Sequence, residues 1–165
     1  MGEVHGLLGV ISLGAGAWIL LRPKGTRVHA WLGRIYVATM AGLNVSALRI
    51  YHLTGKFNLF HILALVSLAT LLVGFVAVRR RGSPRWLWRH YQYMCWSYVG
   101  LLAATINEAS IRVPPIRRLV DSTGPVAPLA LSLLLVLVSA AVILRKQNEI
   151  LKPFAPGKTT NHQSG

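Results

Sequence analysis

Residues 59–78 read LFHILALVSLATLLVGFVAV, a run of 20 residues without a charged side chain. A helix needs about 20 apolar residues to cross the roughly 30 Å hydrocarbon core of a bilayer. Inside that core the chain must satisfy its own backbone hydrogen bonds, so a crossing segment is helical. Residues 126–144 form a second long apolar run without charge. These two runs predict an integral membrane protein built from helices.

Three further stretches have the length of a membrane span but carry more polar side chains. They are residues 4–21, 31–51 and 93–111. Arg34 lies near one end of the second of these stretches, and the third contains Asn107 and Glu108. We therefore predict an all-α integral membrane bundle of about five transmembrane helices within one domain, residues 1–152. Residues 153–165 form a polar tail that we expect to be disordered.

The charged residues indicate an orientation. Lys and Arg number 18 against 4 Asp and Glu, and charged residues make up only 13% of the chain, about half of the roughly 25% usual in soluble domains. The connections after the first and third spans, together with the tail, hold twelve Lys and Arg, whereas the opposite side holds five. The positive-inside rule then puts the N-terminus outside and the C-terminus in the cytoplasm. Because the basic residues fall between apolar runs, we expect anionic lipids as partners on the cytoplasmic side and no nucleic acid.

Polar side chains fall into two layers, one near each membrane face. His29 and His52 are 23 residues apart on or beside one span, roughly 35 Å along a helix, so they belong to opposite faces. The candidate outer site comprises His5, His52, His61, Glu108 and Arg112, with Asn107 in the same layer. The candidate inner site comprises Arg27, His29, Arg34, Tyr36 and His90.

Small and polar residues also predict which helix faces pack inward. We expect inward faces at His5, Gly9, Ser12 and Gly16, at Ala38, Gly42 and Ser46, and along the stripe His90, Met94, Ser97, Leu101, Ala104, Glu108 and Arg112. An alternative role for Tyr36 and Gly33 is packing, with Gly33 permitting a close helix approach. The last span has only Ser132 and Ser139 and is expected at the periphery.

The stretch RVHAWLGRIY, residues 27–36, resembles the R-x-H-x-x-x-G-R-x-Y hallmark of a bacterial family of small polytopic membrane proteins catalogued as a domain of unknown function. His5 at the head of a Gly-rich first span and the pair Arg89-His90 fit the same resemblance, which covers about residues 5–112. The resemblance implies a multi-pass protein of the bacterial inner membrane. It implies no activity.

Glu108 is the most informative single residue. A carboxylate inside a membrane span is costly and indicates a functional site by default. Arg112 follows four residues later on the same helix face, however, and supplies a structural partner. We favour this ion pair over a role of Glu108 in ligand binding or proton transfer.

The histidines permit a redox hypothesis. Bis-histidine haem needs one imidazole from each of two facing helices at the same depth. His5 with His61 would form such a pair outside, and His29 with His90 inside. This arrangement resembles transmembrane di-haem b-type cytochromes. The alternative is a set of interfacial histidines that bond headgroups, water or backbone carbonyls, which the position of His29 and His90 at the membrane boundary favours.

A zinc site is a further alternative for the outer layer. His5, His52, His61 and Glu108 are suitable ligands, although no two of them have the i, i+3 or i, i+4 spacing of a local metal motif. For the arginines of the inner layer we favour contacts with lipid phosphates.

No hydrolase elbow, P-loop, CxxC pair or dinucleotide fingerprint occurs in the sequence. We therefore lean towards a non-enzymatic binding or accessory protein, a subunit of a larger membrane complex, with a polar histidine-containing site near the outer face. One alternative is a membrane redox protein that binds haem b or a quinone. Another is a small transporter or a zinc-dependent membrane enzyme.

Overall fold

The computed structural model describes residues 2–49, 55–57, 59–83, 85–124 and 126–151. These ranges hold six helices and no β-strand. The helices are α1 (Gly2–Leu21), α2 (Arg27–Leu48), α3 (Leu59–Arg79), α4 (Trp86–Arg112), α5 (Pro114–Thr123) and α6 (Val126–Leu151). The all-α prediction is confirmed.

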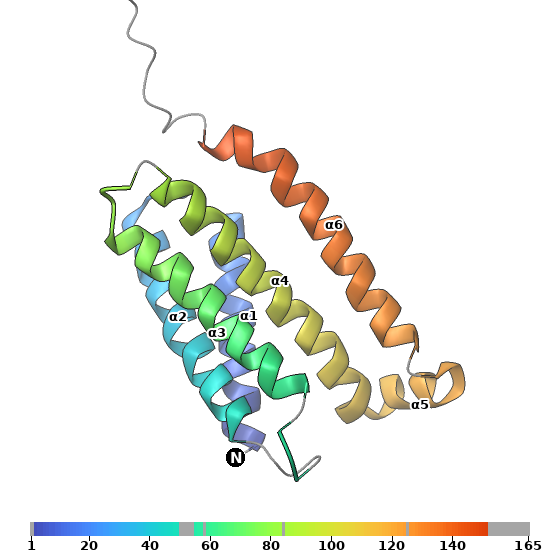
Figure 1. Ribbon diagram of the computed structural model, residues 1–165. Helices are drawn as coiled ribbons and strands as arrows, with labels where there is room; N and C mark the ends of the chain where they lie inside the picture. The colour runs from blue at the N-terminus through green and yellow to red at the C-terminus, as the bar shows by residue number, and fades with distance from the viewer. Residues whose placement is uncertain (1, 50–54, 58, 84, 125, 152–165) are drawn as a thin grey trace, which may run out of the picture.

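Four of the helices form an antiparallel bundle (Figure 1). α1 packs along α2, α2 along α3 and α3 along α4, and α4 returns to contact α1. Helices α1 and α3 therefore occupy one diagonal of the bundle, and α2 and α4 occupy the other. α6 packs along α4 outside the bundle, which confirms its predicted peripheral position, and α5 joins α4 to α6.

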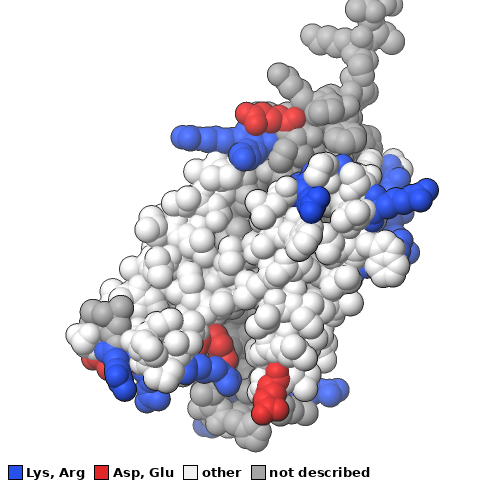
Figure 2. Space-filling view, turned by 180° about the vertical axis from the view of Figure 1, so that it is seen from behind, with Lys and Arg blue, Asp and Glu red and all other residues white. Residues whose placement is uncertain are grey.

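The surface of the molecule is that of a membrane protein. Three helical segments are long and apolar enough to cross a bilayer by themselves: residues 2–21, 60–79 and 126–147. α2 and α4 are less apolar, but they have 22 and 27 residues and run beside the apolar helices (Figure 1). Figure 2 shows charged side chains gathered at the two ends, with an uncharged band between them. We describe the chain as a membrane bundle in which five long helices lie side by side.

Helix α2 extends beyond the start of the predicted span 31–51. α2 begins at Arg27 instead of Trp31, because the Thr26 hydroxyl caps it by accepting a hydrogen bond from the amide of His29 (3.1 Å). α2 ends at Leu48, and the end of the predicted span 31–51 lies outside the described residues, as does His52.

Helix α5 was not predicted from the sequence. The two prolines at its start were interpreted only as breakers between spans, but Pro is well suited to the first turn of a helix, where its missing N–H costs nothing. Gly124 ends α5 with a positive φ of 79°, a backbone conformation that glycine adopts without strain.

The core of the bundle lies at its centre, among α1, α2, α3 and α4. Its buried cluster is Ala15, Tyr36, Met40, Leu71 and Leu101. The Tyr36 hydroxyl is 2.9 Å from the Ser97 hydroxyl, a bond that joins α2 to α4. The Ser12 hydroxyl donates to Thr39 (2.8 Å) and joins α1 to α2. Gly16 lies against the ring of Tyr98, where a side chain would collide.

The predicted packing faces are partly correct. Ser12, Gly16, Ser97 and Leu101 are buried as expected. Ala38 and Ala104 are exposed instead, because the buried face of α2 runs through Tyr36, Met40 and Asn44. The prediction for Gly33 is wrong, since nothing lies within 4 Å of a Cβ placed there.

Candidate functional site

Each of the four bundle helices carries one histidine within its first five residues. These histidines are His5 on α1, His29 on α2, His61 on α3 and His90 on α4. Because neighbouring helices run in opposite directions, His5 and His61 lie at one end of the bundle and His29 and His90 at the other. Each pair comes from one diagonal. The direction of the chain thus groups the histidines in the two pairs expected from the sequence.

The inner pair, His29 and His90, is in direct proximity. The two ring centroids are 6.3 Å apart and the ring planes are 85° to each other. These residues are 61 positions apart in the chain and belong to helices whose backbones do not touch within the described residues. Both side chains therefore extend into the space between α2 and α4.

A backbone carbonyl determines the tautomer of His90. Its Nδ1 is 2.9 Å from the carbonyl oxygen of Gly74 on α3. A carbonyl oxygen only accepts hydrogen bonds, so Nδ1 carries a proton, and in the neutral ring Nε2 carries the lone pair. α3 and α4 approach closely here, since a Cβ on Gly74 would lie 2.9 Å from the Met94 sulfur. The glycine thus allows the contact that orients the histidine.

His29 occupies the first turn of α2, ahead of the predicted span 31–51. It is partly buried, and its Nδ1 is enclosed with no hydrogen-bond partner among the described residues. Burial lowers the pKa of His29 below its ordinary value of 6.5, and the neighbouring His90 and Lys24 lower that pKa further. The lowered pKa favours the neutral ring, which is the form that binds a metal.

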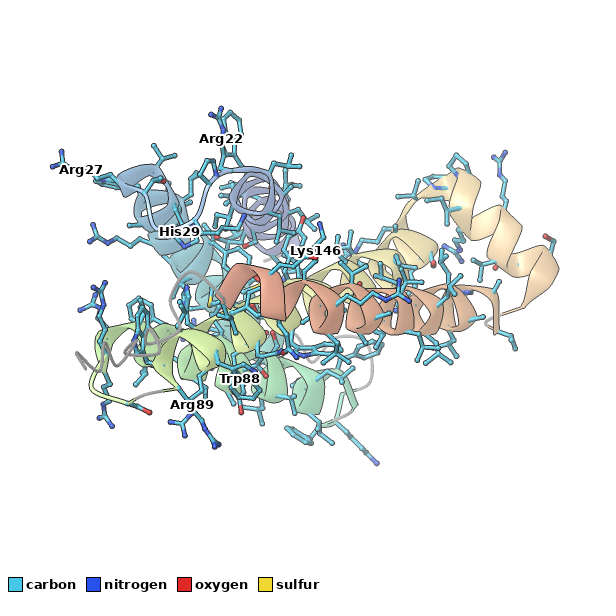
Figure 3. All side chains as sticks on the ribbon, turned by 90° about the horizontal axis from the view of Figure 1, so that it is seen from above. Arg22, Arg27, His29, Trp88, Arg89 and Lys146 are labelled. Carbon is cyan, nitrogen blue, oxygen red and sulfur yellow. The ribbon has the colours of Figure 1, made fainter. Side chains whose placement is uncertain are left out.

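Basic side chains surround the inner pair. Figure 3 shows Arg22, Arg27 and Arg89 pointing outward from the rim, whereas His29 lies between the helices. Lys24 follows the end of α1, and its Nζ donates to the carbonyls of Ile19, Leu20 and Arg22 at 2.8 to 2.9 Å. Its positive charge also acts on His29.

Two members of the predicted inner site lie away from the histidines. Arg34 is exposed, with its guanidinium 5.9 Å from the centre of the Trp31 ring. Tyr36 is buried about two turns further along α2 and bonds to Ser97 in the core. Of these two residues of the motif, Arg34 therefore contacts Trp31 and Tyr36 packs in the core.

The outer layer is only partly assembled. His5 Nδ1 is 2.8 Å from the Ser46 hydroxyl on α2. Glu108 and Arg112 form the expected ion pair, with about half of each side chain exposed, and their charges act on His5. His61 is 2% exposed at the start of α3 and lies against the Phe57 ring, with centroids 5.2 Å apart.

The other polar candidates have structural contacts. Asn107 donates to the Ser132 hydroxyl (3.0 Å) and so fastens α6 to α4. Among the described residues, no three His, Cys, Asp or Glu side chains come together as a metal site would require. The suggested zinc set also includes His52, which lies outside those residues.

Sequence reasoning missed the groups that orient the histidines. The sequence does not indicate that the Gly74 carbonyl is the partner of His90, because every residue has a backbone carbonyl. Ser46 was predicted to face inward, and its spacing from Gly42 was the available signal, but its partner His5 was not identified. Lys24 was used only in the count of Lys and Arg that predicts the orientation of the chain in the membrane.

The fold and the site define an all-α membrane protein with a pair of histidines at each end of a four-helix bundle. The family described as predicted membrane protein (DUF2306) matches residues 2–145. The chain belongs to this family, as the resemblance of residues 27–36 to a family of unknown function suggested. No curated protein and no solved structure matches the chain.

Proposed function

We propose that this protein binds haem b through His29 and His90 and acts as a one-electron carrier in the membrane. The observation that carries the proposal is the geometry of these two rings. A metal bound at about 2 Å by a nitrogen of each ring would hold the ring centres roughly 6 Å apart, and the observed separation is 6.3 Å. Edge-to-face packing also occurs at this separation, but it leaves the buried Nδ1 of His29 without a partner.

The number of ligands favours haem over a free metal ion. Zinc sites need three or four protein ligands, and no such cluster exists among the described residues. Haem iron takes four nitrogens from the porphyrin and needs only two axial ligands from the protein. One histidine from each of two facing helices is the arrangement by which a bundle supplies them.

The polar rim suits a haem with its propionates at the membrane surface. Lys24 lies near His29, and Lys146 is close enough to Lys24 for their charges to interact. Cations at this position would pair with carboxylates that point out of the bundle. Once bound, the iron would alternate between the ferric and ferrous states by gain or loss of one electron.

An absorption spectrum of the purified protein tests the proposal. We expect a Soret band and the reduced-minus-oxidised difference spectrum of a six-coordinate, low-spin b-type haem. His90→Ala should make the inner centre five-coordinate or empty, and added imidazole should restore the low-spin signal. His162→Ala, in the tail, is the matched control and should leave the spectrum unchanged. A haem-free protein, or a His90→Ala spectrum identical to that of the wild type, would overturn the proposal.

Two further roles remain predictions: an accessory subunit of a larger complex, and a binding site for anionic lipid at the cytoplasmic face of a bacterial inner membrane. A hollow of about 400 Å³ at the inner end of α3 and α4 supports the lipid site, because Arg80, Arg89 and Trp86 line it. Mass spectrometry from mild detergent tests both. Bound phosphatidylglycerol that is lost in Arg80→Gln would support the lipid site, and a solitary monomer would exclude the accessory role.

A further inference from the structure

The outer end of the bundle repeats the arrangement of the inner end. His5 and His61 lie in the first turn or so of α1 and α3, as His29 and His90 do in α2 and α4. Helices α1 and α3 form the second diagonal of the bundle, and their backbones also do not touch within the described residues. The two outer histidines therefore come from facing helices at similar depth.

The tautomer of His5 follows from its neighbour. The Ser46 hydroxyl donates its one proton to the carbonyl oxygen of Leu43 (2.7 Å). In its contact with His5 at 2.8 Å, Ser46 must therefore accept, and Nδ1 of His5 must donate. The lone pair of His5 is then on Nε2. A hydrogen bond of this kind, from the nitrogen that does not bind metal, is the usual support of a ligating histidine.

His61 is a strongly polar side chain that is buried at the start of an apolar helix. It is 2% exposed and ranks among the largest fully buried side chains of the described residues. The segment from residue 60 to residue 79 that contains it is apolar enough to cross a membrane. An imidazole at such a place is costly, and intramembrane ionisable residues are usually functional.

A cation also lies beside the outer pair. Arg112 extends from the end of α4 towards the start of α1, where its Nη1 is 3.6 Å from the position of a Cβ on Gly2. The charge of Arg112 also acts on His5, three residues further along α1. Arg112 now pairs with Glu108, but its partly exposed position would let it also bind a carboxylate of a ligand.

We propose that His5 and His61 are the axial ligands of a second haem b near the outer face. This inference rests on the proposed function for the identity of the ligand, but it uses a separate pair of residues. The chain would then hold one haem in each half of the bilayer. The observation that sets the outer pair apart from interfacial histidines is the combination of a complete burial at His61 and a tautomer at His5 that leaves Nε2 for metal.

Haem content per chain tests the inference, measured as the pyridine haemochromogen against protein mass. We expect two haems in the wild type. His5→Ala and His61→Ala should each lower the content to one, or leave two haems with one of them five-coordinate and restored by imidazole. The inner haem reports in the same sample that the variant has folded. His162→Ala, in the tail, is the matched control and should retain two haems.

The outcomes separate this inference from the proposed function. One haem that persists in His61→Ala and is lost in His90→Ala would overturn the outer site and leave the inner site intact. One haem that is lost in His61→Ala and persists in His90→Ala would overturn the inner site and support the outer one. A wild-type protein without haem would overturn both.

Discussion

The chemistry available to each histidine depends on one neighbouring atom. His90 donates to the Gly74 carbonyl and His5 to the Ser46 hydroxyl, so both keep the Nε2 lone pair. His29 has a buried Nδ1 without a partner among the described residues, and burial of an unpaired polar atom costs about 1 to 3 kcal/mol. A bound metal centre would repay that cost.

The lowered pKa of His29 predicts an acid-dependent loss of stability. Below its ordinary value of 6.5, the unfolded state binds a proton that the folded state binds only at lower pH. The free energy of unfolding of the haem-free protein should therefore decrease as pH falls below 6.5 and be independent of His29 above it. Thermal unfolding in detergent from about pH 8 to about pH 5 measures this effect. His29→Gln should flatten the slope, and equal slopes in both proteins would contradict the prediction.

Tyr36 predicts a contrasting result, because it supports the core and does not touch the inner pair. Tyr36→Phe removes the hydroxyl that bonds to Ser97 at 2.9 Å in a buried site, which should cost about 1 kcal/mol of stability. The exposed Tyr93 is the control, and Tyr93→Phe should be nearly neutral. A change in haem content in Tyr36→Phe would contradict the structural role assigned to this residue.

At the scale of helices, the approach of α3 to α4 supports the inner site. The Gly74 carbonyl reaches His90 only because α4 lies close to α3 at this point. Helix α6 is held to α4 by side-chain hydrogen bonds. Gln92 donates to Gln147 (2.6 Å), and Tyr91 donates to the Ile143 carbonyl (3.2 Å). α6 is therefore fastened by side-chain hydrogen bonds to the outside of a bundle that carries both histidine pairs.

Two glycines provide a matched comparison. In Gly74→Ala the new Cβ would lie 2.9 Å from the Met94 sulfur and 3.2 Å from the Tyr93 Cβ. The Met94 side chain must move and the Tyr93 Cβ must shift by a few tenths of an ångström, which should cost about 1 to 3 kcal/mol and weaken haem binding at the inner pair. Gly33→Ala meets nothing within 4 Å and should be neutral or stabilising by up to about 1 kcal/mol. Thermal unfolding and haem retention measure both, and equal effects of the two substitutions would contradict the packing argument.

At the scale of the whole molecule, alternating helix directions and diagonal packing place one histidine pair at each end. Charged side chains gather at the same two ends (Figure 2), and the apolar surface between them matches a bilayer. The proposed orientation puts the inner pair at the cytoplasmic face, where the excess of Lys and Arg lies.

Labelling from one side of the membrane tests this orientation. In a Cys95→Ser background, we expect Arg118→Cys on α5 to react with a membrane-impermeant thiol reagent added to intact cells. Arg81→Cys, in the connection between α3 and α4, should react only after the membrane is opened. Both arginines are exposed in the structure, so accessibility within the protein is matched. The reverse pattern would show that the N-terminus is cytoplasmic.

The membrane class and the long helices follow from the sequence, because the length and apolarity of a run such as residues 59–78 are local properties that a bilayer selects directly. The histidines could also be identified as candidate site residues from the sequence, because a polar residue in or beside an apolar span is easy to recognise. Helix α5 did not, because prolines that end one helix can also begin the next.

Residue-to-residue contacts needed the fold. Spacing along a membrane helix carries little information about its packed face, because lipid-facing and buried positions are both apolar, and Gly33 was misassigned for this reason. The pairing of His29 with His90 depends on α2 and α4 sharing a diagonal. The sequence thus specified the membrane helices and the histidines they carry. The order of helices around the bundle, which depends on side-chain packing between distant segments, brought particular histidines together and oriented their nitrogens.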